Sequence, residues 1–164
     1  MIEKILDLDS YLFLYLNNLG SQYYDNFWIF LSRTEANVMF YLVVLIAYIY
    51  SINNKKRTKI LFHLIIAIVI LITISDQTSN LFKDSFQRLR PCYNELISDS
   101  LRLVKDSCGG RYGFFSAHAS NSFSLAIFFG LLLRSSNRLL ILLFAIYAFL
   151  ISYSRIYLGV HYPI

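Results

Sequence analysis

The sequence predicts an all-α integral membrane helix bundle, built as a single domain over residues 1–164. The first observation is composition: 57% of the residues are hydrophobic and 15% are charged, whereas soluble domains average about 45–50% and about 25%. The second is distribution, because the apolar residues gather in runs such as 38–50, 61–74 and 139–153. The third is that short basic clusters flank these runs, as anchors at lipid headgroups do. The net charge of +5 therefore indicates a bilayer, and not nucleic acid, as the partner.

The N-terminal segment, residues 1–35, is predicted to be an interfacial pair of amphipathic helices. Its apolar stretches at 12–19 and 27–31 are interrupted by polar residues and a glycine: Asn17, Asn18, Gly20, Gln22, Asp25 and Asn26. That pattern is typical of helices lying in the headgroup region. An additional span over residues 11–31 is the alternative. The segment lacks the basic start and small-residue cleavage site of a secretory signal.

Four membrane spans are predicted in the remaining bundle, residues 36–164. They cover residues 36–52, 59–75, 119–133 and 139–157. Each apolar core is slightly shorter than the ~20 residues that cross a bilayer, but tyrosines at the ends extend the spans into the interface. The second helix is expected to continue to Phe86. His63, inside it, is expected to make a buried polar contact.

The lengths of the connections predict the topology. The connections at 53–57 and 135–138 are short, and the one at 87–115 is long and polar. Alternating spans place the two short connections on one side and the long one on the other. The short connections and their flanks carry the denser basic residues, which predicts that they are cytoplasmic: Lys55, Lys56, Arg57, Lys59, Arg134 and Arg138. The long connection is then extracytoplasmic, in a bacterial-type inner membrane.

Both cysteines, Cys92 and Cys108, fall in the long connection. Two cysteines on an exported face can form a disulfide. Such a bridge would close a loop of about 17 residues, worth roughly 3 kcal/mol on the chain-entropy model. Two free thiols are the alternative.

Ionisable residues from three distant parts of the chain are predicted to meet on one membrane face. Lys83 and Arg90 follow the second span, Ser116 and His118 precede the third, and Arg155 and His161 end the fourth. Ionisable groups at this depth usually line a functional cavity. Lysine and arginine can hold a phosphate, and a helix start at Ser116 can receive an anion. No Asp/Glu/His group has metal-ligand spacing, so no metal or other cofactor is expected.

Each of these residues also has a structural interpretation when it is taken alone. Lys83 can extend its amine towards the headgroups, and Arg90 with Pro91 can simply end a helix. Ser116 can be only an N-cap, and Arg155 can anchor the span. His118 can be an ordinary residue at a helix start. The functional interpretation depends on the combination.

That combination resembles the three signature motifs of the type 2 phosphatidic acid phosphatase superfamily. Lys83-x6-Arg90-Pro91 matches its K-x6-R-P pattern. Ser116-Ala117-His118 is similar to P-S-G-H, and Ser154-Arg155-x5-His161 to S-R-x5-H-x3-D. The resemblance extends from about residue 76 to the end of the sequence.

The resemblance implies a metal-independent phosphatase with a helix-bundle fold. It implies that His161 attacks phosphorus and forms a phosphohistidine, and that His118 protonates the leaving oxygen and then assists water. It also implies that the phosphate oxygens are held by a set of donors: Lys83, Arg90, Ser116, the amide of Ala117, and Arg155.

The sequence departs from the family pattern at three places. Phe115 replaces the proline and Ala117 the glycine of the second motif. The aspartate of the third motif would be residue 165, so we expect it, and a fifth, closing span, after Ile164.

Three functions remain open from the sequence. The favoured one is a lipid phosphatase acting on undecaprenyl diphosphate, phosphatidylglycerophosphate, phosphatidate or a lipid A phosphate. The second is a lipid phosphotransferase, because a phosphohistidine can pass its phosphate to an alcohol. The third is an inactive membrane scaffold or phospholipid binder.

Overall fold

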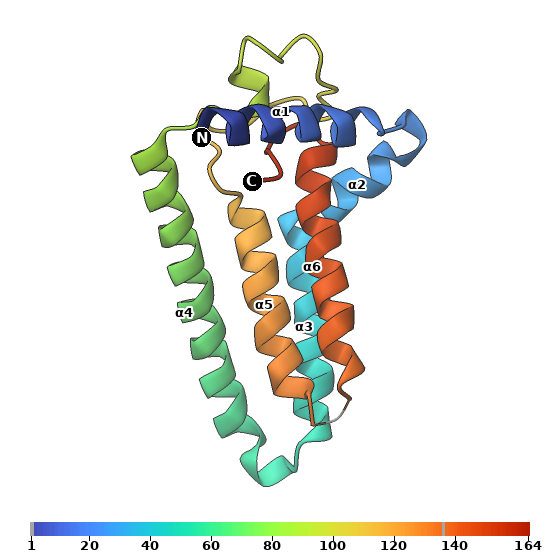
Figure 1. The fold of residues 1–164 in the computed structure, drawn as a ribbon. Helices are drawn as coiled ribbons and strands as arrows, with labels where there is room; N and C mark the ends of the chain where they lie inside the picture. The colour runs from blue at the N-terminus through green and yellow to red at the C-terminus, as the bar shows by residue number, and fades with distance from the viewer. Residues whose placement is uncertain (1, 136) are drawn as a thin grey trace.

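The computed structural model describes residues 2–135 and 137–164 as an all-α helical bundle (Figure 1). Four long helices run roughly side by side: α3 (Thr34–Ser51), α4 (Asn54–Phe86), α5 (Ala117–Leu133) and α6 (Leu139–Tyr157). Within the described residues, the only strand-like pairing is an isolated bridge between Leu89 and Tyr112.

Three of the four predicted spans are long and apolar enough to cross a membrane, namely α3, α4 and α6. The fourth, α5, is apolar but has only 17 residues, about 25 Å at 1.5 Å per residue. Its role as a span therefore stays a prediction. The helices agree with the predicted ranges to within a few residues, and α4 continues without a break to Phe86.

The bundle core lies between α3, α5 and α6. Tyr41 and Leu45 from α3 pack against Phe129 from α5 and against Phe144 and Ala148 from α6. Many other apolar side chains of α3, α4 and α6 are exposed. In water this would be costly, but it suits helices whose outer faces contact lipid chains.

His63 is one correction to the sequence interpretation. It lies exposed on α4, where its Nδ1 contacts the Lys59 carbonyl oxygen at 2.7 Å. A bond within the helix satisfies this nitrogen, so the histidine needs no partner in the core.

The two short connections lie at one end of the bundle, and the long connection lies at the other (Figure 1). The predicted alternation is therefore present. Residue 136 of the second short connection lies outside the described residues.

The long connection contains a short helical turn, η2 (Pro91–Tyr93), and a disulfide joins Cys92 to Cys108 with their Cα atoms 6.4 Å apart.

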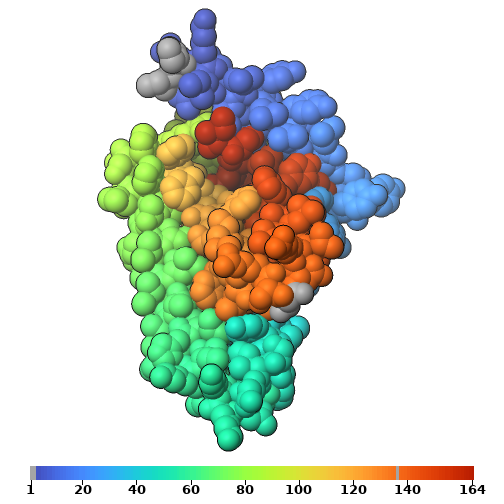
Figure 2. Space-filling view, turned by 60° about the horizontal axis from the view of Figure 1, so that its bottom comes forward, coloured from blue at the N-terminus to red at the C-terminus, as the bar shows by residue number. Residues whose placement is uncertain are grey.

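The N-terminal segment forms two helices, α1 (Ile2–Asn18) and α2 (Asp25–Leu31), separated by the turn η1 (Gln22–Tyr24). The alternative of an additional span over 11–31 is therefore wrong, because the helix breaks at Leu19. Figure 1 shows α1 lying crosswise over the end of the bundle that carries the long connection. In Figure 2 the C-terminal residues lie between α1 and the start of α5.

Candidate active site

The start of α5 presents Ser116 as its N-cap. The Ser116 hydroxyl accepts a hydrogen bond from the amide of Ala119 at 3.4 Å. This bond stabilises the first turn. The capping role expected from the sequence is therefore present, and it does not prevent the serine from lining a cavity.

Arg155 lies in the last turn of α6, with a side chain that is almost completely buried. Its guanidinium donates a hydrogen bond to Ser32 Oγ. Its Nε is buried and has no partner within residues 2–135 and 137–164, and no carboxylate of those residues pairs with it. An unpaired buried cation costs several kcal/mol, as an order of magnitude, so the position favours an anionic ligand.

His161 follows the end of α6 after a turn at Gly159. Gly159 has φ +80, and a Cβ there would lie 2.9 Å from the Arg102 carbonyl oxygen, so the turn requires glycine. The His161 ring is buried, with 4% of its surface exposed, and Nδ1 lies 2.9 Å from the Gly113 carbonyl oxygen. A carbonyl only accepts, so Nδ1 carries the proton and Nε2 keeps its lone pair.

Burial holds the pKa of His161 well below its ordinary value of 6.5, and the charges of Arg90 and Arg155 lower it further. The Gly113 carbonyl opposes this shift by stabilising the protonated ring, and Lys83 adds a smaller lowering. The ring is therefore neutral at physiological pH. A neutral imidazole with a free Nε2 is chemically suited to act as a nucleophile.

Ser116, Arg155 and His161 together line one cavity of about 120 Å³. Gly113, Phe115 and Ala119 form another part of its wall. Three residues that the sequence placed in one site, from α5, α6 and the segment after α6, thus surround a space of the size of a small anion.

Lys83 and Arg90 do not line this cavity. The Arg90 guanidinium donates to the carbonyl oxygens of Cys108 at 2.9 Å and Tyr112 at 3.3 Å. Gly113 allows this close approach, because a Cβ there would lie 2.7 Å from Arg90 Cγ. The Lys83 amine lies 3.5 Å from Asn80 Oδ1. Both cations act on His161 through their charge.

His118 lines a second cavity, of about 320 Å³, on the other side of the first turn of α5. Ala117 and Asp76 line the same space, and the Thr34 hydroxyl lies 3.5 Å from His118 Nε2. Part of the wall of this cavity is apolar and is formed by Val38, Tyr41, Ile72 and Leu125. The structure therefore separates His118 and Ala117 from the cavity that contains His161.

The structure adds Lys105 to the cations around the site. Hydrogen bonds hold the chain on both sides of Lys105. The Val104 amide donates to the Leu158 carbonyl at 3.4 Å, and the Cys108 carbonyl accepts from the Arg90 guanidinium. Burial lowers the pKa of Lys105, and the charges of Arg155 and then Arg90 lower it further, while Glu35 raises it. Among the described carboxylates, none forms an ion pair with its amine.

Sequence reasoning missed Lys105 and three polar partners: Ser32 beside Arg155, the Gly113 carbonyl beside His161, and Asp76 beside His118. Ser32 follows α2, which no motif covers, and Asp76 lies on α4 before the first motif begins at Lys83. A backbone carbonyl has no sequence signal at all. Asp76 interrupts the apolar pattern of α4, where Asn121 Nδ2 donates to it at 2.8 Å, and this interruption was the one available clue.

Comparison with known proteins shows the family to which the chain is related. The sequence model of the PAP2 superfamily matches residues 64–164. A lipid A 4'-phosphatase of Bacteroides thetaiotaomicron is 37% identical over 99% of this chain and 71% of its own length. A lipid A 4'-phosphatase of Porphyromonas gingivalis is 33% identical over 98% of this chain and 66% of its own length. The chain thus spans roughly two thirds of these relatives.

A solved structure extends the comparison to the fold. The crystal structure of a transmembrane PAP2-type phosphatidylglycerolphosphate phosphatase from Bacillus subtilis superposes with a TM-score of 0.67. The match covers 97% of this chain and 75% of the other, at 12% sequence identity, and therefore concerns the fold alone. The superfamily match and the whole-chain identity to two relatives together show that this chain belongs to the PAP2 superfamily of membrane phosphatases.

Proposed function

We propose that this protein removes a phosphate from a lipid A headgroup, at the extracytoplasmic face of a bacterial inner membrane, through a phosphohistidine on His161. The names of two relatives at 33–37% identity support the choice of lipid A. Undecaprenyl diphosphate, phosphatidylglycerophosphate and phosphatidate are the substrates to be compared with it.

The observation that carries the proposal is the unpaired charge of Arg155 beside the neutral ring of His161. A phosphate in their cavity would neutralise the guanidinium and satisfy its free Nε. It would also bring phosphorus next to the Nε2 lone pair. An inactive scaffold would need neither a buried unpaired cation nor a neutral histidine beside it.

In the first step we assign Nε2 of His161 as the nucleophile. The N–P bond forms while the bond from phosphorus to the lipid oxygen breaks, and protonated His118 gives its proton to that oxygen. Arg155, Ser116, the Ala117 amide, Lys83 and Arg90 are assigned to stabilise the charge on the phosphate oxygens.

In the second step water attacks phosphorus and His118 accepts its proton. The N–P bond breaks and inorganic phosphate leaves. Because the two histidines line adjacent cavities, the substrate has to reach both, with the phosphate in the polar cavity and the lipid oxygen on the His118 side. Burial, and then the charges of Arg155, Lys105 and Arg90, lower the pKa of His118 to about 4, and the Asp76 carboxylate opposes this shift only in part. We therefore assign the negative charge of the bound phosphate to favour the protonated ring.

The test is phosphate release from defined lipids by the full-length protein in proteoliposomes. Lipid A carrying both phosphates, phosphatidate, phosphatidylglycerophosphate and undecaprenyl diphosphate are compared at equal surface concentration. We expect preferential loss of one phosphate from lipid A, with mass spectrometry locating the loss at the 4' position. Equal or greater turnover of another lipid would overturn the substrate assignment. Transfer of the phosphate to an added acceptor alcohol, with no inorganic phosphate released in its absence, would identify a phosphotransferase.

A further inference from the structure

We propose that one face of α1, formed by Asp9, Phe13 and Asn17, positions the segment that carries His161. These three residues are spaced four apart and are 1%, 0% and 0% exposed, whereas Leu8, Tyr11 and Tyr15 on the same helix are exposed. Residues four apart lie on one side of a helix. Lipid anchoring accounts for the exposed apolar side chains, but it does not account for a buried carboxylate and a buried amide.

Asn17 holds the end of α6, a few residues before His161. Its Nδ2 lies 3.0 Å from the carbonyl oxygens of Ile156 and Tyr157, in the last turn of α6, and 3.0 Å from the carbonyl oxygen of Arg102. Its Oδ1 accepts from the Arg102 amide at 2.7 Å. Carbonyls at a helix C-terminus have no partner within the helix, so Asn17 caps α6 directly after Arg155.

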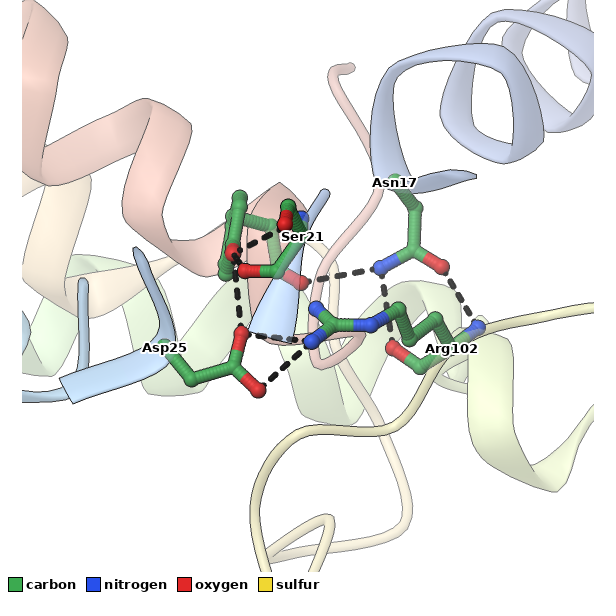
Figure 3. Close-up of polar contacts among 5 residues, drawn as sticks. Asn17, Ser21, Asp25 and Arg102 are labelled. Carbon is green, nitrogen blue, oxygen red and sulfur yellow. Dashed lines mark hydrogen bonds and ion pairs between the residues drawn. The ribbon is translucent and has the colours of Figure 1, made fainter. Parts of the chain in front are cut away.

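A second set of contacts supports the same junction. Figure 3 shows the Arg102 guanidinium beside the Asp25 carboxylate, with Asn17 on the backbone of Arg102. The Tyr157 hydroxyl lies 2.8 Å from Asp25 Oδ1. The pKa of Asp25 is lowered, chiefly by the hydrogen bond from Arg102. The long connection, the start of α2 and the end of α6 are therefore joined where α1 ends.

Asp9 and Phe13 hold the chain immediately after His161. Asp9 Oδ1 accepts from the Ile164 amide at 3.0 Å, and Oδ2 accepts from Arg88 at 2.6 Å. Arg88 also donates to the Ile164 carbonyl at 2.9 Å, which closes a ring of three bonds. The Phe13 ring meets the Tyr162 ring edge-on with centroids 5.3 Å apart, and the Arg88 guanidinium lies 3.9 Å over that ring.

His161 therefore lies between two points fixed by one rigid helix. Within the described residues the His161 ring forms its hydrogen bond with Gly113 and none with α1, so we assign Asp9, Phe13 and Asn17 as positioning residues and not catalytic ones. A nucleophile displaced by about 1 Å can lose about 100-fold in rate. Loss of either anchor should therefore reduce the chemical step and spare phosphate binding, which depends on Arg155 and its neighbouring cations. This inference rests on the proposed phosphatase activity.

The experiment compares Asp9→Ala with Asp7→Ala, an exposed carboxylate on the same helix, in the full-length protein in proteoliposomes. We expect Asp9→Ala to lower kcat by about 10- to 100-fold with KM little changed. Asp9→Asn, which keeps an acceptor for the Ile164 amide, should recover part of the loss. Asp7→Ala should behave as wild type. Asn17→Ala tests the other anchor in the same way.

A second measurement does not depend on activity. Hydrogen exchange of the amides in residues 158–164 should be faster in Asp9→Ala than in wild type and unchanged in Asp7→Ala. Unchanged exchange, or a kcat for Asp9→Ala within about twofold of wild type, would overturn the inference. A parallel loss of kcat and of binding to vanadate, used as a phosphate mimic, would assign Asp9 a general structural role instead. Wild-type protein that releases no phosphate from any lipid would contradict the proposed function, and the exchange data would still decide the role of α1.

Discussion

At the scale of single residues, the site contains two buried side chains, of which His161 is neutral and Arg155 is charged. His161 is neutral because its surroundings penalise the protonated ring. Arg155 retains its charge in a buried position without a carboxylate partner among the described residues. The buried charge of Arg155 becomes favourable once a phosphate enters the cavity, since the anion supplies the missing partner.

Arg155→Lys should be far from conservative. One ammonium cannot reproduce the several donors of the planar guanidinium. The shorter lysine side chain would also lose the hydrogen bond to Ser32 Oγ. We expect a loss of about 2–4 kcal/mol in transition-state stabilisation, in the range found for removing one oxyanion donor. The readout is kcat/KM on the preferred lipid, with Arg134→Lys, an exposed arginine at the opposite end of the bundle, as the control. Near wild-type kcat/KM for Arg155→Lys would remove this residue from the site.

The pH dependence follows from the lowered pKa of His161. Protonation removes the Nε2 lone pair, and the lowered pKa delays that protonation to pH values below 6.5. Histidine NMR of the full-length protein should therefore find His161 neutral at pH 6.5. Protonation of this nucleophile should not reduce kcat/KM at that pH. A His161 pKa at or above 6.5 in the free protein would contradict this. The same shift makes the free energy of unfolding depend on pH. The contribution of neutral His161 to stability is complete above pH 6.5 and is lost as pH falls through the lowered pKa of this ring.

The motifs predicted which residues meet at one end of the bundle better than they predicted how these residues are arranged. Lys83, Arg90, Ser116, Arg155 and His161 gather at one end of the bundle, because spacing and span alternation determine which end each reaches. The separation of His118 from His161 was not predictable, since it depends on which side of the first turn of α5 His118 faces. The partners Ser32 and Gly113 were not predictable either, because they come from packing between elements distant in sequence.

At the scale of elements, the spans were the most predictable part of the fold. Long apolar runs determined α3, α4 and α6, and the helix ends agree within a few residues. The short α5 shows the limit, because hydropathy does not reveal whether 17 residues complete a crossing. The polar face of α1 was not foreseen, because Asp9 and Asn17 resemble solvated residues until the loop that they bind is known.

The long connection between α4 and α5 contributes to the site as well as joining helices. We expect Lys105 to contact the substrate phosphate, so Lys105→Ala should raise KM about tenfold or more, as for loss of a charge-assisted hydrogen bond. The chemical step should change less, because both histidines and Arg155 remain. Lys55→Ala, an exposed lysine at the opposite end, is the control. An unchanged KM in Lys105→Ala would show that this amine does not reach the substrate.

At the scale of the whole molecule, the long connection and α1 lie at one end of the bundle (Figure 1), and the residues that line the His161 cavity belong to the same end. A site at the end of a bundle, beside a helix with an exposed apolar surface, suits a substrate whose headgroup stays at the membrane surface while its acyl chains remain in lipid. The basic short connections at the other end predict that the site faces away from the cytoplasm.

The disulfide offers a direct test of that orientation. After mild reduction of intact cells, a membrane-impermeant thiol reagent should label Cys92 and Cys108, because both lie in the long connection. Omitting the reductant should prevent labelling, since the pair is oxidised. Labelling that occurs only after the cells are lysed would reverse the orientation and place the site in the cytoplasm.

The central claim, that His161 is the nucleophile, is tested most directly by trapping the intermediate. The full-length protein is quenched in alkali during turnover of a lipid labelled in its phosphate, and the label is located by peptide mass spectrometry. We predict acid-labile phosphate on His161, retained or increased in His118→Ala with an activated p-nitrophenyl leaving group and absent in His161→Ala, which should also lose turnover. Continued turnover by His161→Ala, or label found on another side chain, would contradict the account.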